Sequence, residues 1–202
     1  FNVTIPYKKK IFKHLKTKNV HASQIGAVNC VLVGTNTKGI NTDWIGYLGS
    51  IKNTKIKKSG KILILGFGGA AQAIFYGFSK KKYKNIIVFN RSRKAIKTSG
   101  AIRFTKKYSL IDKHLKEADL IINTTPTNPL NRKQTKLIKT STIISDIVYK
   151  PKETAFLKNF RENKKIYGIS MLIEQAIPCF HYWFGFSPDV DSELLNKINS
   201  KI

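Results

Sequence analysis

A short glycine-rich segment, Gly66-Phe67-Gly68-Gly69-Ala70-Ala71, has the residue types that bind a dinucleotide. It fits the pattern G-x-G-x-x-A, in which the first glycine allows a tight turn and the second lets a pyrophosphate approach the backbone. Ala71 allows the following helix to pack closely on the preceding strand. The free N–H groups at the start of that helix, and its dipole, favour the phosphates. The alternative is a glycine turn with a purely structural role.

A basic turn, Asn90-Arg91-Ser92-Arg93-Lys94, follows the next apolar run and indicates which dinucleotide is bound. An NAD site places Asp or Glu here to hold the ribose hydroxyls, and a carboxylate would repel a 2′-phosphate. Arg91 can instead donate forked hydrogen bonds to that phosphate, and Ser92 can donate one more. The turn therefore predicts NADP as the cofactor. The alternative is that these residues are ordinary surface cations of a basic protein.

Three further polar residues stand in otherwise apolar surroundings: Asn29 in "GAVNC" (26–30), Asp43 in "GINTDWIG" (39–46) and Gln175 in "MLIEQA" (171–176). Each has a simple structural alternative. Asp43 could cap a helix, Asn29 could close a turn, and Gln175 could face solvent. Taken together with Lys8, they form a set of hydrogen-bonding groups suited to a small polyol acid.

The elements that would position these residues alternate between strand and helix. Residues 61–65, "KILIL", predict a buried strand, 66–80 a glycine turn and helix, and 85–90 a second buried strand. This is a βαβ unit. Further along the chain we expect a helix end and strand in 113–125, a strand in 141–149, a helix in 153–164 and a strand in 165–170. The alternation predicts a Rossmann-like, doubly wound parallel sheet.

The two ends of the chain have a different pattern. Residues 1–49 predict an extended stretch, a Lys-rich helix near 7–19 and a strand at 27–34, whereas 171–202 predict a long helix, a loop at 187–188 and the short helix "SELLNKIN". We therefore expect a substrate domain in 1–50, an NADP-binding domain in 51–170, and C-terminal helices in 171–202 that return to the substrate domain. The outer, partial α/β domain would be built from both chain ends.

The formal net charge of +26 comes from 37 basic and 11 acidic residues. Only five of the basic residues are Arg, whereas nucleic-acid readers rely on Arg for forked contacts to phosphate and guanine. Because the lysines are also spread along the whole chain, we do not expect a nucleic-acid partner.

The Cys and His residues predict neither a metal site nor a disulfide scaffold. Cys30 and Cys179 lie far apart in the sequence, and the four His lack ligand spacing. The sequence also contains no run of eighteen apolar residues and no signal peptide. We therefore expect a cytoplasmic protein without a membrane-bound segment.

Seven segments together resemble the shikimate dehydrogenase family and occur in the family's order. They are "NVTIPYK" (2–8), "GAVN" (26–29), "NTDWIG" (41–46), "GFGGAAQA" (66–73), "NRS" (90–92), "DIVYKP" (146–151) and "GISMLIEQA" (168–176). The resemblance covers nearly the whole chain. It implies an oxidoreductase that uses NADPH to reduce 3-dehydroshikimate to shikimate reversibly, in the biosynthesis of chorismate and the aromatic amino acids.

The resemblance also implies roles for individual residues. Lys8 would be the catalytic lysine and Asp43 its partner. The substrate would contact Thr4, Lys8, Asn29, Asp43, Tyr149 and Gln175. The cofactor would contact Gly66, Phe67, Gly68, Gly69, Ala70, Asn90, Arg91, Ser92, Arg93, Lys94, Ile147, Gly168 and Met171.

The implied chemistry suits a lysine beside a carboxylate. Hydride addition to a ketone carbon leaves negative charge on the oxygen, and an ammonium group can stabilise that charge and donate the proton. Asp43 favours the charged form of Lys8. We therefore interpret Asp43 as a group that orients both Lys8 and a substrate hydroxyl.

The chain departs from the family in three places. The basic residue after the Asn-Arg pair usually comes one position later than Lys94, so both Arg93 and Lys94 are candidates for the 2′-phosphate. A glycine is expected near Asn128 in the loop "NTTPTNP" (123–129). A strand and a Ser-x-Ser pair that binds the substrate carboxylate would precede residue 1. The sheet edge exposed without that strand would favour insolubility or a homodimer formed through that edge.

Several alternative functions remain open from the sequence. One is a quinate/shikimate dehydrogenase that uses NAD. Another is a protein similar to methylenetetrahydrofolate dehydrogenase, against which "NTDWIG" and "SMLIEQA" count. A truncated, non-catalytic homologue that binds nucleotide and a basic nucleic-acid-binding protein are the others. The last would bind with a steep salt dependence.

Overall fold

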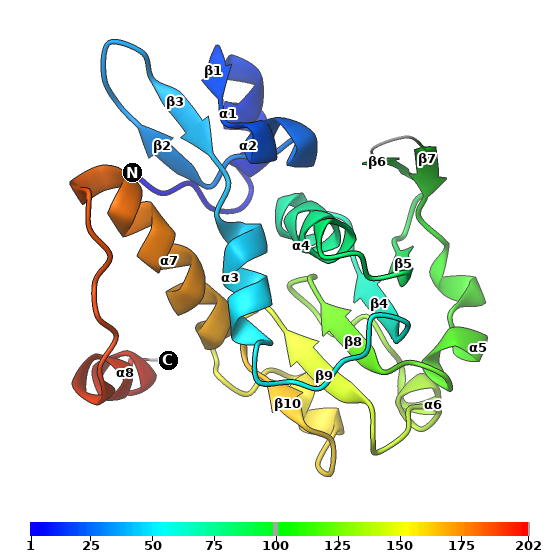
Figure 1. Ribbon diagram of the computed structural model, residues 1–202. Helices are drawn as coiled ribbons and strands as arrows, with labels where there is room; N and C mark the ends of the chain where they lie inside the picture. Colours follow the sequence, from blue (N-terminus) through cyan, green and yellow to red (C-terminus); the bar gives the residue numbers. More distant parts are fainter. Residues whose placement is uncertain (99–100, 202) are drawn as a thin grey trace.

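A computed structural model describes residues 1–98 and 101–201 (Figure 1). Its larger sheet has five parallel strands in the order β10-β9-β8-β4-β5. They are β4 (Lys61–Leu65), β5 (Asn85–Phe89), β8 (Leu120–Asn123), β9 (Ile143–Asp146) and β10 (Lys165–Ile166). The chain adds β5 on one side of β4 and then the remaining strands on the other side. This confirms the predicted Rossmann-like, doubly wound sheet.

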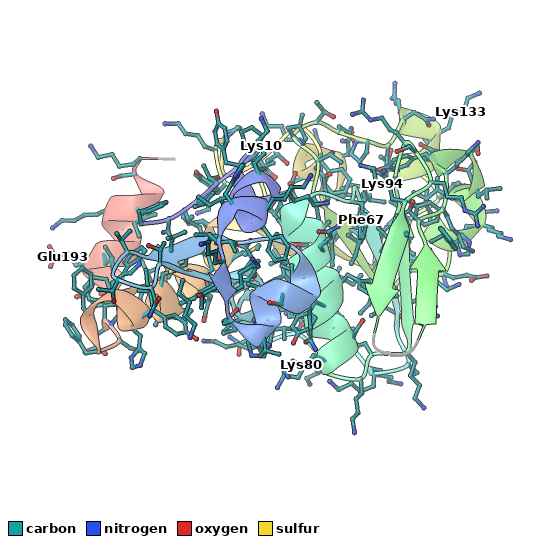
Figure 2. All side chains as sticks on the ribbon, turned by 90° about the horizontal axis from the view of Figure 1, so that it is seen from above. Lys10, Phe67, Lys80, Lys94, Lys133 and Glu193 are labelled. Carbon is teal, nitrogen blue, oxygen red and sulfur yellow. The ribbon has the colours of Figure 1, made fainter. Side chains whose placement is uncertain are left out.

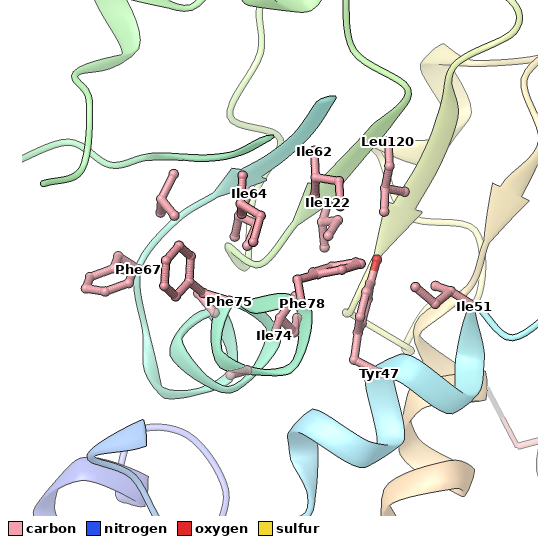
Figure 3. Packing of buried hydrophobic residues seen from close by; sticks show 14 of the residues in the cluster. Tyr47, Ile51, Ile62, Ile64, Phe67, Ile74, Phe75, Phe78, Leu120 and Ile122 are labelled. Atoms are coloured by element: carbon pink, nitrogen blue, oxygen red, sulfur yellow. The ribbon is translucent and has the colours of Figure 1, made fainter. Parts of the chain in front are cut away.

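Side chains alternate between the two faces of each strand, and the apolar side chains on both faces are packed in core clusters. In β4, Ile62 and Ile64 join one core cluster, whereas Leu63 and Leu65 join another. The first cluster is completed by α3 (Asp43–Ser50), α4 (Gly69–Lys80) and α7 (Gly168–Phe184). Figure 3 shows Phe78 of α4 packed between the sheet and Tyr47 of α3, with Phe75 on the side of Phe67. The second face is covered by residues of η1 (Tyr108–Leu110), α5 (Asp112–Leu115) and η2 (Leu157–Asn159), whereas α6 (Arg132–Thr135) has no buried residue.

A smaller, three-stranded sheet lies at the other end of the molecule, in the order β1-β3-β2 (Figure 1). Its elements are α1 (Lys8–His14), β1 (Thr17–Lys18), α2 (Val20–Ile25), β2 (Cys30–Leu32) and β3 (Lys38–Ile40). The long helix α7 reaches this sheet, where Trp183 Nε1 donates a hydrogen bond to the Val31 carbonyl at 3.2 Å. It also packs against α3 so closely that a Cβ on Gly46 would lie 2.4 Å from Gln175 Cβ. The last helix is α8 (Ser192–Asn199), which agrees with the short helix expected there.

The helix expected at 153–164 is reduced to the single turn η2. Thr154 Oγ1 donates to Asp146 Oδ2 at 2.6 Å and accepts from the Leu157 N–H at 3.2 Å. The Asn159 side chain bonds back to the carbonyls of Ala155 and Phe156 at 2.8 and 3.1 Å. These side-chain bonds compete with the bonds that would continue a helix, and tertiary anchoring sets the local conformation.

Two boundaries and one hairpin also differ from the sequence-based expectation. The Lys-rich helix ends at His14, because residues 17–18 pair with β3 as β1. The strand expected at 165–170 stops at Ile166, and α7 starts at Gly168. After the basic turn, β6 (Ala95–Thr98) and β7 (Ala101–Phe104) form an antiparallel hairpin that the sequence analysis did not predict. Within residues 1–98 and 101–201, no helix combines the length and apolar character needed to cross a membrane.

Candidate active site

The structure brings Lys8 and Asp43 together from two different elements. Lys8 begins α1, Asp43 begins α3, and Lys8 Nζ lies 2.6 Å from Asp43 Oδ2. The side chains are 14% and 3% exposed, respectively, so the ion pair is largely shielded from water. The start of α1 is held in place because the Lys8 carbonyl accepts a hydrogen bond from the Val28 N–H at 3.0 Å. The buried Asp43 carboxylate therefore orients Lys8 through a direct ion pair.

Asn29 and Gln175 are hydrogen-bonded to each other, although they lie 146 positions apart. Asn29 Nδ2 donates to Gln175 Oε1 at 2.9 Å and to Thr42 Oγ1 at 2.8 Å. Thr42 in turn donates its N–H to Asn29 Oδ1 at 2.7 Å and its hydroxyl to the Gln175 carbonyl at 2.9 Å. Gln175 is only 8% exposed, so it does not face solvent. These amides form a satisfied polar cluster next to Asp43, which rigidifies this end of α3.

Two residues of this cluster were missed by the sequence analysis as positioning groups. Thr42 links Asn29 to α7, as described above. Asn41 donates to the Ala27 carbonyl at 3.0 Å and accepts from the Asp43 N–H at 3.1 Å. Both are buried, and the available signal was the run of three polar residues between an apolar strand and a helix. Such a run has more hydrogen-bonding groups than one helix cap requires.

The structure also places the two cysteines beside this cluster. Cys30 and Cys179 are both free, fully buried and packed with Ile40. Cys179 Sγ lies 3.1 Å from Thr42 Oγ1. The hydrogen bond between the two thiols is the largest influence on both, raising the pKa of Cys30 and lowering the pKa of Cys179. Residues that are far apart in the sequence are thus neighbours in the core.

Thr4 and Tyr149, the other two residues expected to contact substrate, are exposed. They join none of the hydrogen bonds described above. Thr4 contributes its carbonyl to the Tyr7 N–H at 2.8 Å, just before α1. Both hydroxyls therefore remain accessible to a ligand.

The glycine loop has the geometry that the sequence predicted. Gly66 has φ +98°, and a Cβ there would lie 2.7 Å from Thr124 Oγ1, so only glycine fits. Gly68 is exposed and extended, with φ −82°, and a Cβ there would meet no heavy atom within 4 Å. The open space over Gly68, in front of the first N–H groups of α4, fits a pyrophosphate. Phe67 and Ala70 are buried, so they would offer only backbone groups to a ligand.

The glycine loop lies directly against the lysine. A Cβ on Gly69 would be 3.3 Å from Lys8 Cβ and 3.5 Å from Ala27 Cβ. The loop follows β4 at the carboxyl edge of the sheet, next to the point where the strand order reverses from β5 to β8. Ligands of doubly wound sheets bind at this type of position. The geometry therefore puts a nucleotide loop and a lysine-carboxylate pair in contact.

The basic turn follows β5 at the same edge of the sheet. Asn90 Nδ2 donates to the Ser92 carbonyl at 2.9 Å, which closes the turn. Arg91, Ser92, Arg93 and Lys94 are exposed. The Arg93 guanidinium stacks on Phe104 with its central carbon 4.1 Å from the ring centroid, whereas the Lys94 N–H donates to Thr105 Oγ1 at 2.9 Å. The two candidates for the 2′-phosphate thus differ in surroundings, since only Arg93 is engaged with a ring.

Ile147, Gly168 and Met171 lie where β9 ends and α7 begins. A Cβ on Gly168 would be 2.5 Å from the Ile147 carbonyl oxygen, so α7 can start this close to β9 only with glycine. Met171 is buried in the core cluster that also contains Phe67. These three positions are therefore on the sheet edge that carries the glycine loop, although the Met171 side chain itself is in the core.

The loop after β8 is shaped by asparagines in place of the expected glycine. Asn123 Nδ2 donates to the Thr125 and Thr127 carbonyls, both at 3.2 Å, and to Asp146 Oδ2 at 3.1 Å. Asn128 Oδ1 accepts from the Leu130 N–H at 3.1 Å. Burial raises the pKa of Asp146, against the effect of the hydrogen bonds that it accepts. No group of three or more His, Cys, Asp or Glu residues that could hold a metal occurs in the described part of the chain.

Comparisons with known proteins agree with this geometry. The family model "Shikimate dehydrogenase substrate binding domain" matches residues 1–31, and "Shikimate / quinate 5-dehydrogenase" matches residues 50–155. Shikimate dehydrogenase (NADP(+)) of Nitrosopumilus maritimus is 36% identical, with 92% of this chain and 73% of the relative covered. The Bartonella quintana enzyme of the same name is also 36% identical, with 98% and 73% covered.

Solved structures show the same relationship. Shikimate dehydrogenase from Aquifex aeolicus superposes with a TM-score of 0.81 at 32% identity, covering 97% of this chain and 75% of that one. Shikimate 5-dehydrogenase from Thermus thermophilus, in complex with NADP(H) and shikimate, has a TM-score of 0.79 at 28% identity, covering 99% and 77%. By these matches over most of its length, the chain belongs to the shikimate dehydrogenase family.

Proposed function

We propose that this chain catalyses the reversible, NADPH-dependent reduction of 3-dehydroshikimate to shikimate. The observation that carries the proposal is the Lys8–Asp43 ion pair, at 2.6 Å, packed against Gly69 of the glycine loop. Relatives of the chain are named for this reaction with NADP. One neighbouring structure holds both NADP(H) and shikimate.

NADPH, when bound, supplies the hydride for this reaction. Lys8 then has two tasks: its ammonium stabilises the charge that develops on the ketone oxygen, and its Nζ donates the proton. Asp43 holds the ammonium in one position, so that little reorganisation is needed during the reaction. Asn29 and Gln175 fix the wall of the site, and the exposed hydroxyls of Thr4 and Tyr149 are available to bind the substrate.

The proposed cofactor site combines the glycine loop with the basic turn. The open space over Gly68 would take the pyrophosphate, and the turn at 90–94 would take the 2′-phosphate. Ile147, Gly168 and Met171 would complete the nicotinamide side. We also propose the division into residues 1–50, 51–170 and 171–202, which is supported by the two separate sheets and by the contact of α7 with Val31.

Assays with two substrates and two cofactors test the function. The full chain is incubated with shikimate or quinate and with NADP⁺ or NAD⁺, and the absorbance of the reduced cofactor is followed. We expect the fastest turnover with shikimate and NADP⁺. A preference for quinate and NAD⁺ would favour the alternative represented by a neighbouring quinate dehydrogenase of Corynebacterium glutamicum in complex with NAD, which is 26% identical. No turnover with any pair would leave nucleotide binding as the function.

A lysine variant tests the catalytic assignment. We expect Lys8→Ala to abolish turnover with little change in shikimate affinity, whereas Lys10→Ala, an exposed position on the same helix, should keep wild-type activity. Leaving a buried carboxylate without its partner costs about 3–5 kcal/mol. The double variant Lys8→Ala/Asp43→Asn removes that charge, so it should fold and still be inactive. Near-normal kcat in Lys8→Ala would contradict the assignment.

The partner and the location of the chain are also proposals. We infer a homodimer, which sedimentation of the purified chain would test against a monomer. We infer a cytoplasmic location, which fractionation of the source cells would test. A nucleic-acid partner is not part of the proposal. We expect the chain to bind neither DNA nor RNA, at low salt or at high salt.

A further inference from the structure

Lys9 lies next to the catalytic lysine but faces a different part of the molecule. Its Nζ is 5.6 Å from the centroid of the Phe67 ring in the glycine loop. Lys9 belongs to α1 in the smaller, substrate-side part of the chain, whereas Phe67 belongs to the nucleotide-binding part. The side chain therefore spans from one part to the other.

A cavity of about 860 Å³ opens beside this contact, between α1 and α2 on one side and α4 and β6 on the other. Its lining includes Lys9, Lys13, Phe67, Gln72, Lys80 and Ile96, and no Asp or Glu. Figure 2 shows Phe67 and Lys94 near each other and Lys80 at the other end of α4. The cavity is thus a basic space that adjoins both the glycine loop and the basic turn.

Lys9 lines this cavity together with Ala95, the residue that directly follows Lys94. Burial is the main cause that lowers the pKa of Lys9, and the charge of Lys94 lowers it further. Neither lysine takes part in any ion pair found in the described residues. A space lined by several ammonium groups and no carboxylate favours the binding of an anion.

We propose that Lys9 and Lys94 together bind the 2′-phosphate of NADP, so that a residue of the substrate-side helix α1 determines cofactor specificity. The inference rests on the proposed function for the identity of the nucleotide. Of the two candidates in the basic turn it names Lys94, whose charge acts on Lys9, whereas the Arg93 guanidinium lies over the Phe104 ring. A phosphate held between the two lysines also ties α1, which begins with Lys8, to the basic turn.

Binding of adenosine nucleotides tests this inference without catalysis. Adenosine 2′,5′-bisphosphate and 5′-AMP differ only in the 2′-phosphate, and calorimetric titration of the full chain at 0.15 M salt gives both affinities. We expect Lys9→Gln and Lys94→Gln each to weaken bisphosphate binding about tenfold, the effect of losing one charge-assisted hydrogen bond to phosphate. Binding of 5′-AMP should stay within about twofold of the wild type.

Two control variants distinguish a specific site from general loss of charge. Lys10→Gln removes an exposed charge one position along α1 and should leave both affinities unchanged. Lys9→Arg keeps the charge and should restore most of the bisphosphate affinity. Wild-type bisphosphate binding in Lys9→Gln, or an equal loss in Lys10→Gln, would overturn the inference.

The titration also separates this inference from the proposed function. If the wild type binds the bisphosphate through Lys9 but turns over neither shikimate nor quinate, the reaction assignment fails while the 2′-phosphate site stands. The opposite outcome is normal turnover with NADP⁺ while Lys9→Gln changes neither the bisphosphate affinity nor the preference for NADP⁺ over NAD⁺. In that case the 2′-phosphate inference fails and the reaction assignment stands.

Discussion

Replacing Gly68 with Ala is expected to weaken nucleotide binding without unfolding the protein. Gly68 is exposed, and its backbone, at φ −82° and ψ −170°, is allowed for any residue. The added Cβ would meet no heavy atom within 4 Å. Alanine restricts the unfolded chain, which stabilises the folded state by about 0.4–1 kcal/mol. It is also a poorer N-cap than glycine, which offsets that gain. The free energy of unfolding should therefore stay within about 1 kcal/mol of the wild type.

Nucleotide affinity should respond much more strongly to the same change. The methyl group would occupy the open space in which the pyrophosphate approaches the backbone at the start of α4. Losing one hydrogen bond from a backbone N–H to a charged phosphate costs about 1.5–3 kcal/mol, which corresponds to a loss of affinity of about 10- to 100-fold. Titration with NADP⁺ measures this loss, and urea unfolding measures the stability.

Gly66→Ala is the matched control two positions earlier. Gly66 has φ +98°, and a Cβ there would lie 2.7 Å from Thr124 Oγ1 and 2.9 Å from Thr125 Cγ2. Left-handed backbone alone costs a non-glycine residue about 1–2 kcal/mol, and the clash adds to this. This variant should therefore lose stability, whereas Gly68→Ala should lose affinity. Wild-type NADP⁺ affinity in Gly68→Ala, or unfolding of Gly68→Ala to the same extent as Gly66→Ala, would refute the reasoning.

Three further changes test the packing and the buried polar groups. Gly46→Ala should destabilise the protein by about 1–3 kcal/mol in urea unfolding, because its Cβ would lie 2.4 Å from Gln175 Cβ; wild-type stability would contradict the close packing of α3 on α7. Burial, followed by the charge of a nearby lysine, lowers the pKa of His21. As the pH falls below about 6.5 the unfolded state is protonated first, so stability should decrease between pH 7.5 and 5.5, and less so in His21→Gln. Thr154→Val removes the donor 2.6 Å from Asp146 Oδ2 and should cost about 1–3 kcal/mol, whereas Thr154→Ser should retain most of the stability.

The parts of the fold that the sequence predicted are those with a strong local signal. β4 and β5 are runs of buried apolar residues next to glycine or polar turns, and α4 follows its glycine loop directly. The helix expected at 153–164 failed because the hydroxyl of Thr154 bonds to Asp146 on a neighbouring strand. Local periodicity carries no information about that partner. The hairpin of β6 and β7 was missed because its strands, "AIKT" and "AIRF", contain charged residues and form no continuous apolar run.

Residue types and order alone determined the parallel sheet, the glycine loop, the basic turn and the resemblance to one enzyme family. Each of these depends on neighbouring residues, so it can be read along the chain. Only the tertiary structure decided that Gln175 faces Asn29 instead of solvent, that Cys30 meets Cys179, and that Lys9 points to the glycine loop. These contacts join segments as far as 149 positions apart, as in Cys30 and Cys179, and they exist because α7 packs against α3 and α1 packs beside the loop. The sequence therefore supplied the chemical groups of the candidate site, and packing determined which of them meet.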